Sequence, residues 1–302
     1  MEILRRLVML LALLGLGYVA RQGGLLTERR TDWLTTAAFY VALPALVFGA
    51  TYDRPLGDLL SPALVAGVPL VIGTTAALAW LVARREPTQS RRSVAIVQSY
   101  HANLGFLGVP LVELTLGGEA AAVASVVLGL SLLTHVPLTI VTLVTINDAD
   151  AAVRDELAAL ARNPVLVSLA AGLLGSAVGL SLPSVADTGL AFVGEFALPL
   201  ALLGVGASLR VDTDGLDPRG TGSVVALKVA VMPAVAFAVF SLLAASQAAL
   251  STAVLMFGMP SAVSTYVYAS ELGGDARFAS VNVFATTVAS LLLVAVAIQV
   301  LG

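Results

Sequence analysis

Two stretches of the sequence place small, polar and helix-breaking residues inside otherwise apolar segments. Residues 101–110 contain an asparagine, two glycines and a proline, and residues 258–266 contain a proline, two serines and a threonine. Residues of these types interrupt a helix, and an interruption leaves backbone N–H and C=O groups without partners. Lipid cannot satisfy such groups, so we predict that each break faces protein, water or a ligand.

An anion is the ligand that such a pair of breaks suits. A half-helix that starts after a break presents free N–H groups and a partial positive charge, so two of them can hold an anion without a basic residue. Pro260 suits the first position of such a half-helix, because its missing N–H would be unpaired there anyway. Ordinary kinks packed by small residues are the alternative for either segment alone. The predicted binding residues are Asn103, Gly105, Pro110, Pro260, Ser261, Ser264, Thr265 and Tyr266.

Ionisable residues inside apolar segments are functional candidates, because burying a charge is costly. Glu195 is the first candidate for proton coupling, although a position near the outer interface explains it equally well. His101 and His135 are further candidates, with a buried neutral ring held by one hydrogen bond as the alternative. Lys228 is expected to extend its long side chain to the cytoplasmic surface. We expect no metal and no cofactor.

The elements that must position these residues are membrane helices. Of the 302 residues, 58% are hydrophobic and 12% are charged, and the mean hydropathy is +0.96. A soluble domain carries about 25% charged residues, so this chain has too few polar groups to cover a globule in water. A span needs about 20 mostly apolar residues. Ten segments meet this requirement, at 3–20, 33–51, 61–82, 94–115, 120–146, 164–182, 188–209, 222–244, 248–271 and 278–301.

The basic residues predict the orientation in the membrane. Twelve arginines lie in the loops that follow odd-numbered spans, and three lie on the other side. Because basic loops stay in the cytoplasm, we predict a plasma-membrane protein with both termini outside. The arginines alternate with apolar runs and form no patch, so nothing indicates nucleic-acid binding.

Two short motifs indicate an internal repeat. Ala-Leu-Pro at 42–44 recurs at 197–199, and Leu-Gly-Gly-Glu-Ala at 116–120 recurs as Leu-Gly-Gly-Asp-Ala at 272–276. Five spans per half is an odd number, so the second half inserts upside down, as in many secondary transporters. The predicted halves are residues 1–146 and 164–302, joined by a short cytoplasmic loop at 147–163. Each interrupted helix is the fourth span of its half.

The first interrupted segment resembles the signature of the auxin efflux carrier family. Residues 103–111 (Asn-Leu-Gly-Phe-Leu-Gly-Val-Pro-Leu) carry the resemblance, with further similarity at 16–18, 39–48, 163–164, 198–209 and 259–269. The resemblance implies a fold like that of bile acid symporters, in which spans 4 and 9 cross at their breaks. Spans 1, 2, 6 and 7 would form a scaffold, and spans 3–5 and 8–10 a moving transport domain. Family members export organic anions, and the plant members are dimers, so a homodimer is expected.

The sequence departs from the family pattern in two places. Ser264 stands where an asparagine is expected, and the loop at 147–163 is too short for a plant-type regulatory loop. We predict a secondary transporter that exports small organic anions by elevator-type alternating access. A receptor with the same fold and a sodium-coupled uptake symporter are the alternatives. An enzyme is not expected, because His-Glu-x-x-His is absent and no paired aspartates suggest an intramembrane protease.

Overall fold

The computed structural model describes residues 2–149, 153–208 and 217–301. The regular structure within these residues is helical, with one isolated antiparallel bridge between Ala102 and Ser261. Among the described residues, six helices are long and apolar enough to cross a membrane, and three shorter helices are also apolar. The prediction of an all-α membrane protein is therefore confirmed. The six are Glu28–Thr51, Pro62–Arg85, Gly118–Asn147, Ser184–Ser208, Pro218–Leu242 and Ala276–Leu293, and the three are Leu104–Leu116, Pro164–Ala177 and Gln247–Phe257.

The helices follow one another with few long connections among the described residues. In the described part of the chain, the π-helical turns η1 and η5 interrupt α-helical segments and η3 begins one, and such turns are frequent at functional sites. In chain order the elements are α1 (Glu2–Gln22), α2 (Glu28–Ala37), η1 (Ala38–Ala42), α3 (Leu43–Thr51), α4 (Leu56–Leu59), α5 (Pro62–Val82), η2 (Ala83–Arg85), α6 (Gln89–Tyr100), η3 (Leu104–Gly108), α7 (Val109–Leu116), α8 (Gly118–Asn147), α9 (Val153–Leu160), α10 (Pro164–Ala177), α11 (Ser184–Glu195), α12 (Ala197–Ser208), α13 (Pro218–Val225), η5 (Ala226–Val231), α14 (Met232–Leu242), α15 (Gln247–Phe257), α16 (Ser264–Glu271) and α17 (Ala276–Leu301).

Local capping signals shift some helix ends from their predicted positions. The Thr27 side chain accepts a hydrogen bond from the backbone N–H of Arg30, so α2 begins at Glu28 and not at residue 33. α10 ends at Ala177 instead of residue 182, because Gly179 adopts a left-handed φ of 66°. The segment predicted as a loop at 147–163 contains helix α9.

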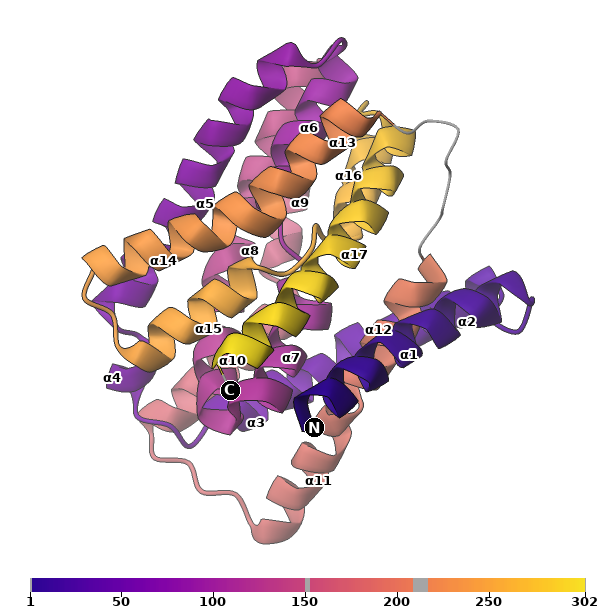
Figure 1. Ribbon diagram of the computed structural model, residues 1–302. Helices are drawn as coiled ribbons and strands as arrows, with labels where there is room; N and C mark the ends of the chain where they lie inside the picture. Colours follow the sequence, from indigo (N-terminus) through magenta and orange to yellow (C-terminus); the bar gives the residue numbers. More distant parts are fainter. Residues whose placement is uncertain (1, 150–152, 209–216, 302) are drawn as a thin grey trace.

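The helices pack in two groups (Figure 1). In the first group, α1 lies along α12, α10 and α11 lie against α3, and α2 contacts α12. The second group contains α5 to α8 and α13 to α17, in which α14 packs on both α5 and α15. Contacts of α3 with α8 and of α12 with η3 join the groups. Both interrupted helices belong to the second group.

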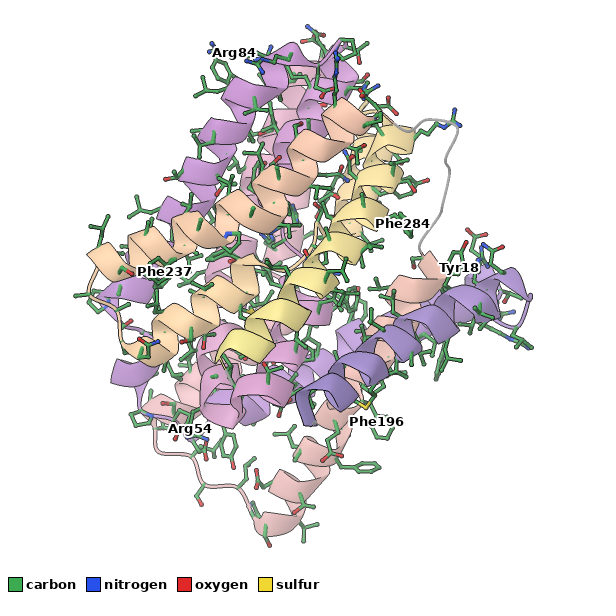
Figure 2. The ribbon with its side chains drawn as sticks, in the orientation of Figure 1. Tyr18, Arg54, Arg84, Phe196, Phe237 and Phe284 are labelled. Atoms are coloured by element: carbon green, nitrogen blue, oxygen red, sulfur yellow. The ribbon has the colours of Figure 1, made fainter. Side chains whose placement is uncertain are left out.

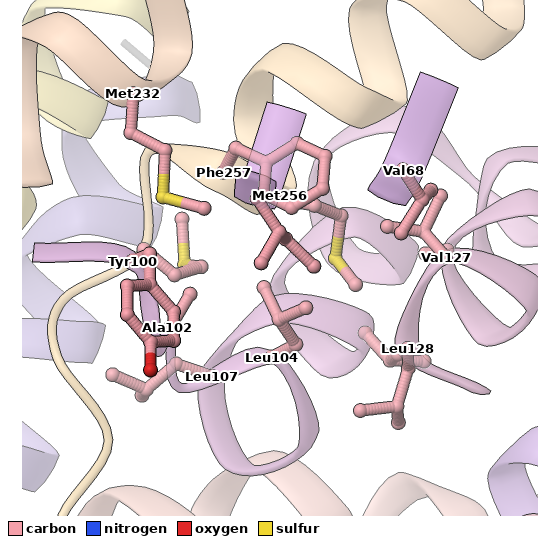
Figure 3. Close-up of a cluster of buried hydrophobic side chains, with 14 of the residues drawn as sticks. Val68, Tyr100, Ala102, Leu104, Leu107, Val127, Leu128, Met232, Met256 and Phe257 are labelled. Carbon is pink, nitrogen blue, oxygen red and sulfur yellow. The ribbon is translucent and has the colours of Figure 1, made fainter. Parts of the chain in front are cut away.

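Apolar side chains are closely packed around the breaks in the second group (Figure 3). Phe257, Leu104 and Leu128 are buried there, with at most 2% of each residue exposed. Lipid tails are as apolar as leucine, so close packing rather than removal from water holds membrane helices together. The breaks are therefore fixed by the fit of their surroundings.

Apolar residues also cover much of the outer surface between charged ends. Phe237 is 57% exposed and points outward, while Arg84 and Arg54 mark opposite ends of the molecule (Figure 2). Leu242 and Phe192 are also largely exposed. A broad apolar surface of this kind suits contact with lipid.

Candidate functional site

The two interrupted helices meet at their breaks. Three residues separate α6 from η3, and six residues separate α15 from α16. The backbone N–H of Asn103 donates to the carbonyl oxygen of Pro260 at 2.8 Å, and that of Ala262 donates to the carbonyl oxygen of His101 at 3.0 Å. The two extended segments thus satisfy each other's backbone groups at a depth where lipid could not.

Pro260 does not begin a half-helix, contrary to the prediction. It lies in the extended segment, because residues there pair with the break of the other helix, and α16 begins only at Ser264. Proline has no N–H to donate, so only its carbonyl oxygen takes part in the pairing. Pro110 lies inside the continuous helix Leu104–Leu116, directly after the π-helical turn η3.

A cavity of about 220 Å³ lies beside the crossing, where the two helix groups meet. The first turn of η3 lines it with Gly105 and Phe106, and the start of α16 lines it with Val263 and Ser264. Phe39 of η1 lines the side that belongs to the first group. The first N–H groups of a helix have no partners within it, so the two helix starts bring backbone donors and positive partial charge to one cavity.

Two polar side chains of this cavity carry unpartnered atoms. Asn103 is 4% exposed and His135 is 2% exposed. Among the described residues, neither Nδ2 of Asn103 nor either ring nitrogen of His135 has a hydrogen-bond partner. A buried polar group without a partner costs about 1–3 kcal/mol. Both residues line the cavity, so a ligand that accepts hydrogen bonds is a candidate partner for these atoms.

The two histidines form a stacked pair at the cavity. Their ring centroids lie 3.8 Å apart, with an interplanar angle of 23°. Nδ1 of His101 lies 2.9 Å from Oγ1 of Thr139, which is the single hydrogen bond of the alternative interpretation. Two positively charged rings in this contact would repel each other, so the pair carries at most one positive charge.

Other predicted residues lie at the crossing but turn away from this cavity. Oγ of Ser261 donates to the carbonyl oxygen of Gln98 at 2.6 Å, and Oγ1 of Thr265 accepts from Nε2 of Gln98 at 3.0 Å. Nδ2 of Asn282 donates to Oε1 of Gln98, so this buried network ties α6 to α16 and α17. Tyr266 lines a second, larger cavity. The predicted binding residues that line the 220 Å³ cavity are Asn103, Gly105 and Ser264.

Glu195 does not line this cavity. It is the last residue of α11, is exposed, and precedes the interruption between α11 and α12. Glu195 therefore does not share a cavity with the two histidines.

Lys228 does not reach the surface, contrary to the prediction. Its side chain is fully buried, and Nζ donates to the carbonyl oxygen of Phe257 at 2.8 Å and lies 3.2 Å from Sδ of Met232. The packing of α14 and η5 against the neighbouring helices turns the side chain of Lys228 inward. The prediction used only the position of Lys228 near the end of its span, and that position does not show which way the side chain points. A basic residue therefore lies close to the crossing, although it does not line the 220 Å³ cavity.

The cavity is approached from one end of the molecule. A cavity of about 840 Å³, which reaches Arg21 and Glu28, shares the residues Phe39 and Phe106 with it. The ring centroids of these two phenylalanines lie 6.0 Å apart. On the other side of the crossing the void is only about 10 Å³. That void is lined by Leu107, Leu111, Leu198, Leu202, Met259, Pro260, Ser290 and Leu291.

Two polar residues of the cavity, Asn163 and Tyr268, escaped the sequence analysis. Oδ1 of Asn163 caps α10 by accepting from the N–H of Val165 at 3.0 Å, and Asn163 also lines the cavity. Tyr268 lines it four residues after Ser264, which is the spacing of one helix face and could have been recognised.

Comparison with known proteins places the chain in a family. A family model described as "Membrane transport protein" matches residues 2–155 and 151–298. The chain belongs to this family. It is the auxin efflux carrier family, so the resemblance seen in the sequence is confirmed.

Relatives within the membrane transport protein family carry names of transporters. An "Uncharacterized transporter" of Methanothermobacter thermautotrophicus (strain Delta H) is 27% identical over 286 residues, which cover 93% of this chain and 92% of the relative. A "Putative malonate transporter" of Rhizobium meliloti (strain 1021) is 24% identical over 282 residues, which cover 88% of each chain. Family membership and the apolar helices together make the chain a multi-pass membrane transport protein.

Proposed function

We propose that this membrane transport protein is a secondary transporter of small carboxylates, which bind at the crossing. The observation that carries the proposal is that Asn103 and His135, which both have unpartnered polar atoms, line a cavity that two helix starts also reach. Neutral donors and helix N-termini suit a carboxylate. The relative named for malonate supports this ligand class, since malonate is a compact dicarboxylate that a cavity of about 220 Å³ has room for.

We further propose ten spans in two inverted halves. The helix contacts support this. α1 of the first half lies along α12 of the second half, and in the same way α10 of the second half lies along α3 of the first half. Glycines mark both contacts, since a Cβ at Gly17 would overlap the backbone of Leu203, and one at Gly172 would overlap the Thr51 side chain. Gly17 and Gly172 are 155 residues apart, the offset of the Ala-Leu-Pro repeat.

In this proposal the first helix group is the scaffold and the second is the moving transport domain. The cavity lies between them and opens toward the end that carries Arg21, which the basic-residue rule assigns to the cytoplasm. An elevator movement of the second group would close this path and open the side that is now packed by leucines. A cavity that faces the cytoplasm is the starting state of an exporter.

We propose that protons drive transport through the pair His101 and His135, which lie at the cavity, rather than through the exposed Glu195. The replacement His135→Gln should abolish the response of transport to an imposed pH gradient, and Glu195→Gln should retain it. The reverse result would assign coupling to Glu195. Stimulation by a sodium gradient alone would favour the sodium-coupled alternative.

The decisive experiment is flux into liposomes that contain the purified protein. Labelled malonate and a panel of other small carboxylates should accumulate above protein-free liposomes, and unlabelled substrate should compete. Binding without flux would favour the receptor alternative. If no carboxylate binds or moves, the proposed function is wrong.

A further inference from the structure

Lys228 is the only lysine of the chain and lies in the interior of the second helix group. Its side chain is fully buried. The described partners of its ammonium are the carbonyl oxygen of Phe257 and the thioether of Met232, both of which are uncharged. A buried ammonium with only such partners is costly, because neither supplies an opposite charge.

No carboxylate in the described part of the chain lies within ion-pair distance of Lys228. Ion pairs in that part of the chain join Arg54 to Asp53 and Glu119, and Arg91 to Glu86 and Asp217, and none of these pairs includes Lys228. In the described part of the chain, no neighbouring side chain therefore supplies a negative charge to a protonated Lys228. An anion that enters from outside the protein would stabilise this protonated form.

The ammonium is attached to the crossing itself. Phe257 is the last residue of α15, and three residues further on Pro260 accepts the hydrogen bond from Asn103. Met232 and Phe257 lie in the same cluster as Ala102, which is part of the break in the other helix (Figure 3). Lys228 does not line the 220 Å³ cavity, so a ligand there would not touch it.

We propose that Lys228 is the fixed positive charge of the carboxylate site and acts as a positioning residue that holds the end of α15 at the break. This inference rests on the proposed function and adds a rule of selectivity to it. The ammonium attracts the ligand through the protein interior, so its contribution grows with the number of negative charges on the ligand. A dicarboxylate should therefore gain more from Lys228 than a monocarboxylate of the same shape.

Two probes and two variants test this rule. Malonate and its monoamide, malonamate, have nearly the same shape but differ by one negative charge. A unit charge about 10 Å away in a medium with an effective dielectric constant of about 20 changes affinity on the order of tenfold. In Lys228→Met, which keeps an unbranched apolar chain of similar length, the ratio of malonate to malonamate affinity should fall about tenfold. Lys228→Arg, which keeps the charge, should keep most of the ratio.

The ratio separates electrostatics from a purely structural role. If Lys228 only holds α15 in place, Lys228→Met weakens both probes equally, and the inference is overturned. If the wild-type protein binds no carboxylate at all, both the proposed function and the inference that rests on it are wrong. Binding by the wild type together with an unchanged ratio in Lys228→Met overturns the inference alone.

A measurement on the wild-type protein decides the matter if Lys228→Met does not fold. Protein labelled with ¹³C and ¹⁵N in lysine gives a single set of side-chain NMR signals, because the chain has one lysine. Saturating malonate should shift the Nζ and Cε signals, and malonamate should shift them less. Signals that respond equally to both probes, or to neither, would overturn the inference.

Discussion

Asn103 takes part in the crossing through its backbone and also lines the cavity. Its N–H donates to Pro260 and its carbonyl oxygen accepts from the N–H of Gly108 at 3.2 Å, so main-chain bonds fix its position. Nδ2 remains without a partner among the described residues. This division allows the side chain to be removed without undoing the crossing.

Asn103→Ala should therefore weaken carboxylate binding while the protein still folds. Loss of one hydrogen bond to a charged ligand costs about 1.5–3 kcal/mol, or roughly a 10- to 150-fold increase in Kd. Titration of the purified variant with malonate measures this change, and a thermal unfolding curve checks its integrity. Ser261→Ala is the comparison and should cost less affinity, because Oγ of Ser261 donates to Gln98. Normal affinity in folded Asn103→Ala would exclude the crossing as the binding site.

At the scale of helices, the contact between α1 and α12 depends on a close backbone approach. A Cβ at Gly17 would overlap the backbone of Leu203, whereas Gly15 on the same helix has nothing within 4 Å of its Cβ position. Gly17→Ala should therefore destabilise the protein by about 1–3 kcal/mol, the usual cost of overpacking. Gly15→Ala is the matched control and should be neutral or slightly stabilising, since alanine is the better helix former. Equal melting temperatures of the two purified variants would contradict this prediction.

An ionic cluster joins three helical elements outside the predicted spans. Arg91 of α6 contacts Asp217, the N-cap of α13, at 2.7 Å and Glu86, just after η2, at 3.3 Å. The backbone N–H of Gly220, with help from Arg91, holds the pKa of Asp217 below its usual value. Burial raises the pKa of Glu86 although Arg91 opposes this shift. The two carboxyl groups therefore affect stability in opposite directions as the pH changes.

The lowered pKa of Asp217 predicts how the stability of the protein changes with pH. Its stabilising effect is present above the unfolded-state pKa of about 4 and is lost as the pH falls through the lower folded-state value. Asp217→Asn keeps a capping side chain but removes the charge, so it should lower the melting temperature at pH 7 and make little difference in strong acid. Asp217→Ala should cost about 1 kcal/mol more, because the cap is also lost. If Asp217→Asn lowers the melting temperature by the same amount at pH 7 and in strong acid, the electrostatic explanation is contradicted.

The raised pKa of Glu86 predicts the opposite trend. The fold favours its protonated form, and that contribution is present below about pH 4.3 and lost as the pH rises through the higher folded-state value. Glu86→Gln should therefore cost less than Asp217→Asn at pH 7, since burial already offsets the attraction between Glu86 and Arg91. The same unfolding curves at pH 7 measure both variants.

At the scale of the whole molecule, the orientation in the membrane is open to a direct test. The chain has no cysteine, so a single introduced cysteine reports one position. Asp53 and Arg85 are both exposed, and the neighbouring Arg54 and Arg84 lie at opposite ends (Figure 2). Because basic loops stay inside, a membrane-impermeant maleimide should label Asp53→Cys in intact cells and Arg85→Cys only in inverted vesicles. Labelling in the reverse pattern would overturn the proposed orientation.

The amino-acid sequence alone determined the class of the protein and the position of its breaks. Hydropathy identified the membrane helices, and the glycine, asparagine and proline residues at 101–110 and 258–266 identified both interruptions. These properties are local, because a helix forms or breaks according to residues within one or two turns. The choice of Asn103, Gly105 and Ser264 as cavity residues followed from the same local signals.

Only the tertiary structure decided which way the side chains near the breaks turn. Pairing of the two extended segments kept Pro260 out of a helix, and turned Ser261 and Thr265 toward Gln98. The inward direction of Lys228 depends on Phe257, 29 residues away in the sequence. The physical reason is that each outcome depends on contacts between helices that lie far apart along the chain, and the periodicity of a single helix contains no information about the neighbour it will pack against.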